Sequence, residues 1–482
     1  MRVRYLLPQP EIHTAAVVLA AGKGSRLKSP IPKVAHIVAG RPMLHWVLDA
    51  LAALNLDKIV VVVGHEGDQV RDLVESAQVD NTVCVTQVEQ LGTGHAMRCA
   101  LGLTNGEHPD NDPSLLADAE RILLVYGDGP TLSPHTLVEL VEGGQGNEAT
   151  VLTTMLDDPT GYGRIIRNTS GMVTEIVEQR DTNETQASIR EINTGIYCFE
   201  REPLVKALGQ LTTDNSQGEE YITDVVGILA PRVGAVVVAP DEVMGINDQI
   251  QLAESAAVLR TRIIRAYQEN GVAIIDPATT YIEHGVSIEP GAVIEPGCHL
   301  RGTTRIGAAR IGPNADLTDT TVEDGATITY SVVTGATIGA DATVGPFAHL
   351  RPGTVLAPKA KAGGFVETKN ATIGEGSKVP HLSYIGDASI GAGSNIGAGT
   401  ITCNYNGYKK FRTTVGEGTF IGSDSMLIAP VTIGNGAYVG AGSAVATDVP
   451  DGALYIERAQ PVVKDGWASK FHARYAKPDT DQ

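Results

Sequence analysis

Short apolar runs alternate with helical patterns over the first half of the chain. AAVVLA, KIVVVV, RILLVY and GAVVVA are continuous aliphatic runs that begin at residues 15, 58, 121 and 234. Runs of this kind predict strands that are buried on both faces. Apolar residues recur at helical spacing between the first two runs, from Met43 to Leu54. This alternation predicts an α/β, Rossmann-like domain with a mostly parallel, doubly wound sheet over residues 14–246.

The pattern changes after one predicted connecting helix. Residues 247–271 keep a single apolar face, with acids early, arginines late and Asn270-Gly271 as a stop signal. From residue 272 to 467, aliphatic residues recur at every sixth position, and glycine often follows them. A three-sided coil with one inward aliphatic residue per side gives this period, whereas a helix does not. The pattern therefore predicts a left-handed parallel β-helix of hexapeptide repeats. Residues 1–13 form an N-terminal extension and residues 468–482 a polar tail, both without an expected role.

Composition and charge exclude several classes of protein. The formal net charge of −19 argues against DNA or RNA as a partner, because nucleic-acid binding depends on neutralising phosphates. The five cysteines are scattered without a C-x-x-C motif, which favours reduced thiols and a cytoplasmic location. The sequence has no apolar stretch of about 18 residues, so we expect no membrane insertion.

A glycine-rich, cationic loop follows the first predicted strand. The stretch GKGSR matches neither the dinucleotide-binding fingerprint nor the nucleoside-triphosphatase loop. Gly22 and Gly24 would let the backbone approach a phosphate, and a following helix would present free amides. Arg26 and Lys33 add positive charge in the same segment. Taken alone, the loop is either a phosphate-binding site or an ordinary turn.

An acid stands at the end of a predicted buried strand. Asp128 follows RILLVYG, where a carboxylate is costly unless it binds a cation. Mg²⁺ takes carboxylate and amide oxygens together with substrate phosphates, and Asn247 in GIND would provide a second ligand. The alternative is that Asp128 only caps a turn or helix.

These motifs together carry a resemblance. LAAGKGSRL and the following PK are similar to the signature of sugar-1-phosphate nucleotidyltransferases. With QLGTGHA, YGD, DDPTGYGRI, EINTGIY and GEEYITD in order, the chain resembles bacterial bifunctional N-acetylglucosamine-1-phosphate uridyltransferases and glucosamine-1-phosphate N-acetyltransferases over roughly residues 14–467. The resemblance implies Mg²⁺-dependent transfer of UMP from UTP to N-acetylglucosamine 1-phosphate, with release of pyrophosphate. Metal, Arg26 and Lys33 would offset the repulsion between the two anionic substrates.

The resemblance also assigns residues of the first half to ligands. It implies that three residues lie near the uracil (Gln87, Gly92 and Thr93), three at the sugar (Gly163, Glu178 and Asn193) and two at the metal (Asp128 and Asn247). The implied nucleotide and sugar contacts as a whole are Leu19, Ala20, Ala21, Gly22, Lys33, Gln87, Gly92, Thr93, Tyr126, Gly127, Asp128, Gly163, Glu178, Asn193 and Asn247.

Two segments interrupt the hexapeptide count in the second half. ETKNATIG, from residue 367, and TCNYNGYKKFRTT, from residue 402, insert polar and bulky residues that a coil does not need for stability. Such excursions are where chemistry is expected. His381 in HLSYIGD would ordinarily be a solvated or structural histidine, but its polar neighbours around the broken coils favour a site.

Here the resemblance implies an acetyltransferase that uses acetyl-coenzyme A and a β-helix that forms a homotrimer, with neighbouring chains completing each site. His381 would be the general base, and Asn404 a donor to the developing oxyanion. The sugar phosphate would contact Arg351, Lys369, Tyr384 and Asn395, and the coenzyme would contact Ala398, Asn404, Tyr405, Ser423, Ala441 and Arg458.

Some residues depart from the family pattern, and two alternatives stay open. Gly129 stands where a valine is usual, Gly364 where asparagine is common, and Pro380 where a small residue is usual. The main alternative is a monofunctional sugar-1-phosphate nucleotidyltransferase whose β-helix serves assembly or regulation. The other is a carbohydrate-binding scaffold without catalysis.

Overall fold

The computed structural model describes residues 13–22, 24–64, 67–104, 106–215 and 218–475. These residues form two compact units, one reaching residue 267 and including 282–285, the other containing 268–281 and the residues after 285. Most of the N-terminal extension and the last seven residues of the tail lie outside the described residues. The described helices include none whose length and apolar character would suffice to cross a membrane.

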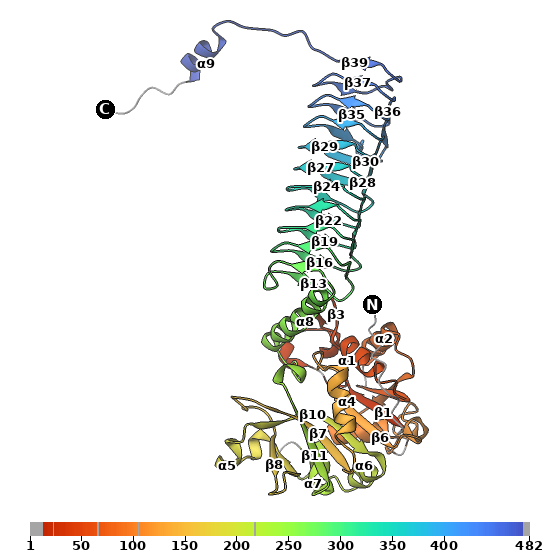
Figure 1. Cartoon of the computed structure of the whole chain (residues 1–482), viewed down its shortest axis with the longest axis vertical. Helices are drawn as coiled ribbons and strands as arrows, with labels where there is room; N and C mark the ends of the chain where they lie inside the picture. Colours follow the sequence, from red (N-terminus) through yellow and green to blue (C-terminus); the bar gives the residue numbers. More distant parts are fainter. Residues whose placement is uncertain (1–12, 23, 65–66, 105, 216–217, 476–482) are drawn as a thin grey trace, which may run out of the picture. The chain divides into compact units, whose positions relative to one another are not determined.

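The first unit is built on a nine-stranded mixed sheet (Figure 1). Its central strands β6, β1, β4 and β5 are parallel neighbours, and β11 is parallel to β7. β10 is inserted antiparallel between β6 and β7, and β9 runs in the same direction as β10, so the prediction of a mostly parallel sheet is confirmed with two reversed strands. The strands are β1 (Thr14–Leu19), β4 (Lys58–Gly64), β5 (Thr82–Gln87), β6 (Arg121–Tyr126), β7 (Ala149–Met155), β8 (Arg164–Arg167), β9 (Val173–Val177), β10 (Glu191–Glu200) and β11 (Val233–Val238).

Helices cover both faces of this sheet. Alternate residues of β1 enter different cores: Ala15 and Val17 join one cluster, and Ala16 and Val18 the other. The first cluster contains side chains of α3, α6 and α7, and the second contains those of α1, α2 and α4. A strand buried on both faces needs no polar alternation, which explains its continuous aliphatic sequence. The helices are α1 (Met43–Ala52), α2 (Asp68–Ala77), α3 (Thr93–Ala100), α4 (Pro134–Glu142), α5 (Glu184–Ala187), α6 (Arg201–Leu208) and α7 (Ile222–Leu229).

Short elements complete the first unit. The glycine-rich loop is followed by one turn of 3₁₀ helix, Ser25–Leu27, and not by the α-helix that the sequence predicted. Pro30 and Pro32 follow at once, and proline cannot continue a helix interior. The remaining short elements are β2 (Ile37–Val38), β3 (Arg41–Pro42) and the 3₁₀ turns Lys33–Ala35, Pro113–Leu116, Gln179–Asp181 and Pro240–Glu242. The predicted connecting helix exists as α8 (Gln249–Glu269).

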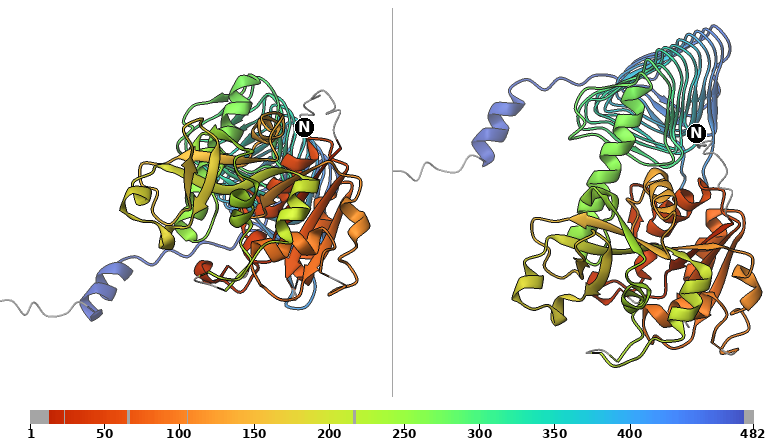
Figure 2. Two further views of the ribbon diagram at one scale, coloured as in Figure 1. Left: turned by 90° about the horizontal axis from the view of Figure 1, so that it is seen from below. Right: turned by 60° about the horizontal axis from the view of Figure 1, so that its bottom comes forward.

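The second unit is a left-handed parallel β-helix, whose coils are seen as nested turns in Figure 2. Its strands, from β12 (Ala273–Ile274) to β39 (Leu454–Tyr455), form one sheet of eleven and another of seventeen strands, and strands of successive coils pair in parallel. Ile288 pairs with Ile306, and Ile294 with Ile311, so each residue lies over one about three hexapeptides away. These four isoleucines are buried. Each hexapeptide therefore contributes one inward-facing aliphatic residue, and these residues stack in rows along the sides of the β-helix.

Strand length changes where the repeat is interrupted. β28 (Glu367–Ile373) and β30 (Tyr384–Ile390) are seven residues long, whereas most strands of this unit have two or three. They pair with Glu367 opposite Tyr384. After β32 (Ile401–Cys403), the chain leaves the coil and returns at β33 (Thr413–Val415), with a bridge between Tyr405 and Lys410. Structure also continues beyond the β-helix, as α9 (Trp467–Tyr475), where the sequence predicted only a polar tail.

The other strands of the second unit are β13 (Tyr281–Ile282), β14 (Ser287–Ile288), β15 (Val293–Ile294), β16 (His299–Arg301), β17 (Arg305–Ile306), β18 (Arg310–Ile311), β19 (Asp316–Thr318), β20 (Thr321–Val322), β21 (Thr327–Ile328), β22 (Val332–Thr334), β23 (Thr337–Ile338), β24 (Thr343–Val344), β25 (His349–Leu350), β26 (Val355–Leu356), β27 (Lys361–Gly364), β29 (Lys378–His381), β31 (Asn395–Ile396), β34 (Phe420–Ile421), β35 (Met426–Ile428), β36 (Val431–Ile433), β37 (Tyr438–Val439) and β38 (Ala444–Val445).

Candidate active sites

Four residues from distant parts of the chain meet near the carboxyl ends of β1 and β6. The ammonium of Lys33 forms an ion pair with the Asp128 carboxylate and donates to Asn247 Oδ1 at 2.9 Å. Arg26 donates to the same Asn247 oxygen at 2.8 Å. The side chains of Lys33 and Asp128 are only 14% and 16% exposed. Two cations and two acceptors therefore share one partly buried point.

Local backbone contacts hold this group together. The Ile246 amide donates to the Asp128 carbonyl at 3.1 Å, so GIND lies directly against YGD. The Gly127 amide donates to Leu19 at 2.9 Å and joins YGD to the start of the glycine-rich loop. Gly24 has a φ of +62°, and a Cβ at this position would lie 2.7 Å from Lys33 Cβ. Glycine is thus required at residue 24 for conformation and for space.

The loop backbone is open on its other side. A Cβ at Gly22 would meet nothing within 4 Å, and Gln90 Nε2 donates to the Ala21 carbonyl at 2.6 Å. Ala20 is held by its amide, which donates to Val62 at 2.9 Å. The loop is therefore fixed from the sheet side and leaves room for a ligand at the glycine.

The oxygens of Asp128 and Asn247 fit a magnesium site. Both face the Lys33 ammonium, so two hard oxygen donors already converge on one cation. Mg²⁺ usually takes one or two protein oxygens and completes its coordination with water and substrate phosphates. The donor set is therefore suitable for Mg²⁺ bound together with a phosphorylated substrate.

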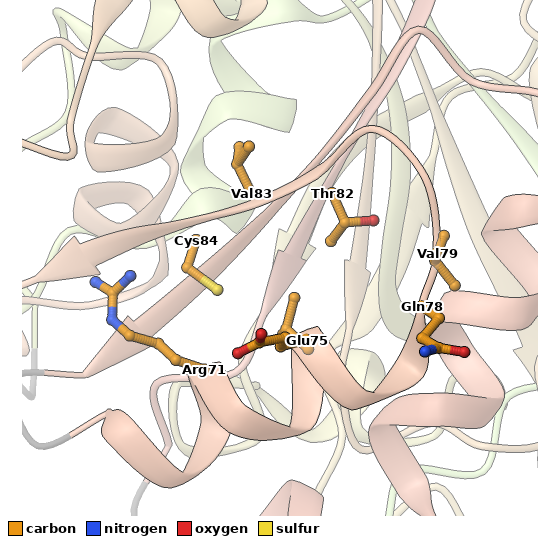
Figure 3. Close-up of a pocket in the computed structure, with 8 residues that line it drawn as sticks. Arg71, Glu75, Gln78, Val79, Thr82, Val83 and Cys84 are labelled. Atoms are coloured by element: carbon orange, nitrogen blue, oxygen red, sulfur yellow. The ribbon is translucent and has the colours of Figure 1, made fainter.

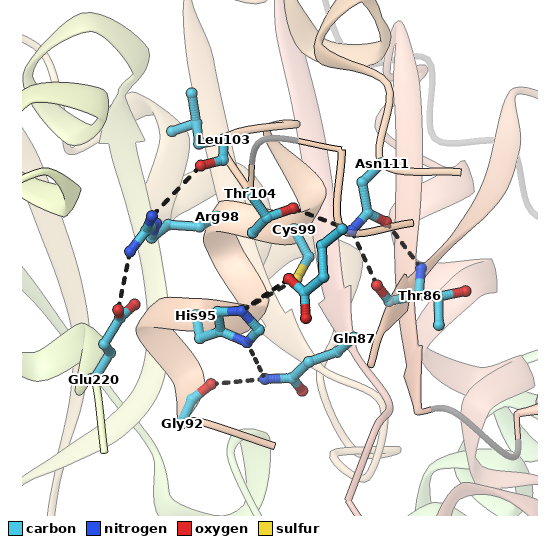
Figure 4. A network of polar contacts seen from close by, with 11 residues as sticks. Thr86, Gln87, Gly92, His95, Arg98, Cys99, Leu103, Thr104, Asn111 and Glu220 are labelled. Carbon is cyan, nitrogen blue, oxygen red and sulfur yellow. Dashed lines mark hydrogen bonds and ion pairs between the residues drawn. The ribbon is translucent and has the colours of Figure 1, made fainter. Parts of the chain in front are cut away.

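A second group of predicted residues lies at the end of β5. Gln87 is 4% exposed, and its Nε2 donates to the Gly92 carbonyl at 3.0 Å (Figure 4). Gly92 precedes α3 with a φ of +109°, where a Cβ would approach the Glu220 backbone. The Thr93 hydroxyl accepts from the Ile222 amide at 3.0 Å. Gln87, Gly92 and Thr93 thus belong to one rigid corner.

The three predicted sugar-binding residues are also brought together. A Cβ at Gly163 would lie 3.4 Å from a Glu178 carboxylate oxygen and 3.6 Å from Asn193 Cβ. The Asn193 amide donates to the Gly163 carbonyl at 2.9 Å, and the Tyr197 hydroxyl donates to Asn193 Oδ1 at 3.0 Å. Burial raises the pKa of Glu178, and the neighbouring acids Asp181 and Asp224 add to the effect. Burial likewise raises the pKa of Tyr126, with contributions from Asp128 and Glu178.

In the β-helix, cations gather along the interrupted coils. Arg351 donates to Glu367 at 2.9 Å. The pKa of Lys369 is lowered, first by the hydrogen bond and charge of Lys410 and then by Arg351. Sequence reasoning missed Lys410, although YKKFR stands in the insertion that was singled out. Crowded ammonium and guanidinium groups repel one another, so this cluster is suited to an anion.

A second cluster surrounds Gly386 on β30. Asn404 is 7% exposed, and its Nδ2 donates to Asp387 at 2.6 Å. A Cβ at Gly386 would lie 2.8 Å from that Nδ2 and still closer to the Tyr384 hydroxyl. Tyr384 and Asn404 therefore converge over a backbone position that only glycine can occupy. Sequence reasoning assigned no role to Gly386 or Asp387, whose only signal was the motif YIGD.

Other predicted acetyltransferase residues lie on the same or neighbouring coils but have fewer contacts. The side chain of His381, exposed on β29, has no hydrogen bond with any described residue. Lys378 of the same strand pairs with Asn395. Tyr405 is 61% exposed.

The predicted coenzyme contacts lie on successive coils. The Asp424 amide donates to Ala398 at 2.7 Å, and the Gly442 amide donates to Ser423 at 2.8 Å. The guanidinium of Arg458 donates to the Ala441 carbonyl. Ala398, Ser423 and Ala441 therefore follow one another along the β-helix, with Arg458 beside the last.

The departures from the family pattern leave space. A Cβ at Gly129 would meet only the Tyr126 carbonyl at 3.8 Å, and one at Gly364 only the Pro346 carbonyl at 3.5 Å. Both are ordinary contact distances. Pro380 lies within β29, which reaches His381 despite the proline.

Two cavities of the first unit lie away from these sites. One of about 330 Å³ between α2 and β5 is lined by Arg71, Glu75, Gln78 and Cys84 among others (Figure 3). Another of about 750 Å³ lies near the start of β6 and the end of β10, with Arg121, Glu200 and Arg232 in its wall. Neither contains a predicted site residue.

Comparisons with known proteins agree with this division. Residues 16–227 match the MobA-like NTP transferase domain, and residues 412–447 match the bacterial transferase hexapeptide family with six repeats. The bifunctional protein GlmU of Brevibacillus brevis is 50% identical over 463 residues, covering 95% of this chain and 97% of the relative. Those of Streptomyces avermitilis and Thermoanaerobacter pseudethanolicus are 48% and 43% identical, over 95% and 94% of this chain and 94% and 97% of each relative.

The fold and its two clusters define a nucleotidyltransferase joined to a hexapeptide-repeat acyltransferase. The chain belongs to the family of the bifunctional protein GlmU. It is a bifunctional enzyme that acetylates glucosamine 1-phosphate with acetyl-coenzyme A and transfers UMP from UTP, with Mg²⁺, to N-acetylglucosamine 1-phosphate. The monofunctional and scaffold alternatives are therefore set aside.

Proposed function

We propose that uridylyl transfer takes place where Lys33, Arg26, Asp128 and Asn247 converge. The main support is that Lys33 contacts both Asp128 and Asn247, and that Arg26 donates to the same Asn247 oxygen. Bound Mg²⁺ would neutralise phosphate charge there. Lys33 and Arg26 would then leave the oxygens of Asp128 and Asn247 and contact the phosphates instead. Their positive charges would offset the repulsion between the sugar phosphate and UTP. Gly22 and its neighbours Leu19, Ala20 and Ala21 offer backbone to the nucleotide.

The remaining groups of this site orient the two substrates. Gln87, Gly92 and Thr93 bind the uracil, and Gly163, Glu178 and Asn193 hold the sugar. Tyr126 and Gly127 line the path between them. The assignment is supported by the contacts that make each trio a single rigid unit. Rigid positioning matters here, because phosphoryl-type transfer needs alignment more than covalent assistance.

We assign acetyl transfer to the interrupted coils. His381 removes a proton from the substrate amine as it attacks the thioester carbonyl, and Asn404 donates to the oxygen that becomes negative. The C–S bond then breaks, the amide remains on the sugar, and coenzyme A leaves as a thiol with the proton from His381. Asp387 holds the Asn404 amide, which has a second N–H for that oxygen. Arg351, Lys369, Tyr384 and Asn395 bind the sugar phosphate. The coenzyme lies along Ala398, Tyr405, Ser423 and Ala441, with Arg458 near its phosphates.

We propose that the β-helix assembles as a homotrimer and that neighbouring chains complete each acetyltransferase site. An apolar column of four exposed side chains supports this: Tyr330, Phe347, Phe365 and Leu382 are 43%, 55%, 62% and 63% exposed. The first three rings follow one another at 5.7 and 5.3 Å. Exposed apolar surface of this extent favours association. The column ends beside His381, which explains why that side chain is open within one chain.

Compartment and domain limits complete the proposal. All five cysteines are free thiols, which is compatible with the reducing cytoplasm. We take 14–246 as the uridyltransferase domain, 247–271 as the linker helix and 272–467 as the acetyltransferase domain. The boundary between the two compact units near residue 267 lies close to the end of the linker helix, which supports the limit between the linker and the acetyltransferase domain.

The test is a coupled assay with two variants. Purified protein receives glucosamine 1-phosphate, acetyl-coenzyme A, UTP and Mg²⁺, and thiol and pyrophosphate release are followed separately. His381→Ala should silence thiol release while supplied N-acetylglucosamine 1-phosphate still yields pyrophosphate. Asp128→Asn should do the reverse. Loss of both activities in either well-folded variant would contradict the assignment to two independent sites.

A further inference from the structure

A histidine that the proposed chemistry does not use lies between the uracil-binding corner and a loop acid. His95 of α3 is 5% exposed. Its Nδ1 faces Gln87 Nε2 at 3.3 Å, and its Nε2 faces a Glu107 carboxylate oxygen at 3.2 Å. Figure 4 shows the imidazole next to Gln87 and Cys99. Gln87, His95 and Glu107 therefore form a continuous chain of hydrogen bonds, which we call the relay.

The partners in this relay determine which atoms carry hydrogen. An ionised carboxylate only accepts, so Glu107 places the proton of a neutral imidazole on Nε2. Nδ1 then carries a lone pair and accepts from the group that faces it, which must be the Gln87 NH₂. The Gly92 carbonyl also accepts from Gln87 Nε2, at 3.0 Å. Both hydrogens of the Gln87 amide are thus used inside the protein.

The Gln87 oxygen is what remains for a ligand. Oε1 has no partner among the described residues, and it is not one of the enclosed polar atoms left without a hydrogen bond. An amide that offers only an acceptor selects a base edge that offers a donor. The N3–H of uracil is such a donor, whereas N3 of cytosine carries a lone pair and would be repelled.

We propose that Glu107 and His95 are positioning residues that hold the Gln87 amide with its oxygen toward the base, and so set the preference of the uridyltransferase site for an imide N–H. This inference rests on the proposed function, in which Gln87 contacts the uracil. Neither positioning residue touches the nucleotide. Their effect is to prevent the amide from turning its NH₂ outward.

The loop that carries Glu107 is itself fastened to β5. Asn111 exchanges two hydrogen bonds with the Thr86 backbone, at 3.2 and 3.1 Å, directly before Gln87. Arg71 joins Thr86 and Asp110 at 2.6 Å each. The segment therefore presents Glu107 at a defined place. The segment lies between two motifs and has no periodic pattern, so this role was not predictable from sequence.

The same side chains could be taken for a metal site, and their chemistry favours the relay. His95, Cys99 and Glu107 have donor atoms within 4.8 Å of one another. However, burial, assisted by the Glu107 charge, raises the pKa of the Cys99 thiol to about 12. Without a metal, the thiol therefore keeps its proton at neutral pH, and metal binding would have to displace that proton. A hydrogen-bonded imidazole needs no such ionisation.

The experiment is a double-mutant cycle on the full-length enzyme. KM and kcat for UTP, and the UTP-to-CTP ratio of kcat/KM, are measured for Gln87→Ala, Glu107→Gln and the double variant. Glutamine at 107 keeps the size but can either donate to or accept from Nε2, so it releases the tautomer. Asp118→Asn, an exposed acid farther along the same segment, is the matched charge control.

We expect Gln87→Ala to raise KM for UTP about 10- to 100-fold, the scale of one lost contact in a buried polar site. Glu107→Gln should raise it about 3- to 10-fold and lower the UTP-to-CTP ratio, because the Gly92 carbonyl still holds one amide hydrogen. In the Gln87→Ala background, Glu107→Gln should change KM less than about twofold, since it acts through the missing amide. Acetyl transfer and thermal unfolding should stay as in the parent protein.

The outcomes distinguish the positioning role of His95 and Glu107 from the uracil contact of Gln87 on which it rests. If Gln87→Ala changes KM but Glu107→Gln matches Asp118→Asn, or if the two effects are additive, the positioning role is overturned and the proposed function stands. If Gln87→Ala leaves KM unchanged, the uracil contact itself fails and the inference fails with it. If Cys99→Ala reproduces the effect of Glu107→Gln, a metal-type cluster replaces the relay.

Discussion

The two units build their sites in opposite ways. In the first unit, the site residues come from segments up to 221 positions apart. Their side chains form hydrogen bonds and ion pairs with one another, as Arg26 does with Asn247. In the second, they come from consecutive coils, and His381 and Tyr405 are exposed to solvent. The residues proposed for the first, enclosed site are bonded to one another within one chain, whereas those proposed for the second, open site include exposed side chains. A doubly wound sheet gathers distant loops at one edge, while a solenoid contacts only its neighbouring coils.

This difference has a functional consequence. A site enclosed by its own chain keeps its geometry whatever the oligomeric state, whereas an open face on a coil depends on what covers it. In the proposed trimer, the covering surface is another copy of the chain, seated on the apolar column beside His381. The two activities should therefore respond independently to substitution.

The largest expected effect comes from removing a positive charge from the enclosed site. Lys33→Ala should lower uridylyl transfer by about 100-fold or more, the scale of losing an electrostatic stabiliser in such a site. The variant also leaves Asp128 without its ion-pair partner. Pyrophosphate release measures the effect, with acetyl transfer in the same preparation and Lys28→Ala as controls. A near-native rate would remove Lys33 from the mechanism.

The open site should be equally sensitive at one glycine. Gly386→Ala places a methyl group 2.8 Å from Asn404 Nδ2 and closer to the Tyr384 hydroxyl, so both must move. Displacement of reacting groups by about 1 Å costs on the order of 100-fold, and acetyl transfer should fall by that amount. Thiol release from acetyl-coenzyme A is the measurement.

Gly364→Ala is the matched control for that glycine. Its new methyl group would meet only the Pro346 carbonyl at 3.5 Å, which is an ordinary contact. This variant should keep acetyl transfer near the parent rate. Equal losses in both variants would mean that the β-helix tolerates no added methyl group, and that Tyr384 and Asn404 are not the reason.

Oligomeric state tests the dependence of the open site on other chains. Phe365→Glu puts a charge in the middle of the apolar column and should dissociate the assembly, as seen by sedimentation. Acetyl transfer should fall about tenfold or more, because a buried charge without a partner disrupts an apolar interface. Uridylyl transfer should persist. Ile250→Glu, at an exposed position of α8, controls for the added carboxylate. Acetyl transfer that survives in a verified monomer would show that one chain suffices.

Sequence patterns predicted the folds of both units, because each fold has a strict period that its core requires. The meeting of Lys33, Asp128 and Asn247 was also predictable, since all three follow strands of one sheet. The contacts of Lys410 and Glu107 were not. Both lie in irregular loops, where the direction of a side chain depends on bridges such as Tyr405 with Lys410 that no period encodes.

The smallest expected effect concerns Glu178 and links binding to stability. Its pKa is raised by burial, so the folded protein keeps this proton to higher pH than the unfolded chain does. Unfolding then releases a proton, and the free energy of unfolding falls as pH rises from the unfolded value of 4.5 to the raised folded value. Glu178→Gln lacks this loss, so its stability relative to the parent should increase across that window and level off above it.

The same variant should bind its sugar phosphate more weakly. If Glu178 accepts a sugar hydroxyl as proposed, Glu178→Gln raises KM for N-acetylglucosamine 1-phosphate about tenfold, the cost of replacing a charged acceptor by a neutral one. Urea unfolding at several pH values and initial rates measure the two effects. A variant that loses stability at neutral pH would mean that the carboxylate is stabilised by its surroundings, whereas unchanged KM would place the sugar elsewhere. Together, a gain in stability and a loss in binding would identify Glu178 as a buried charge retained for its ligand.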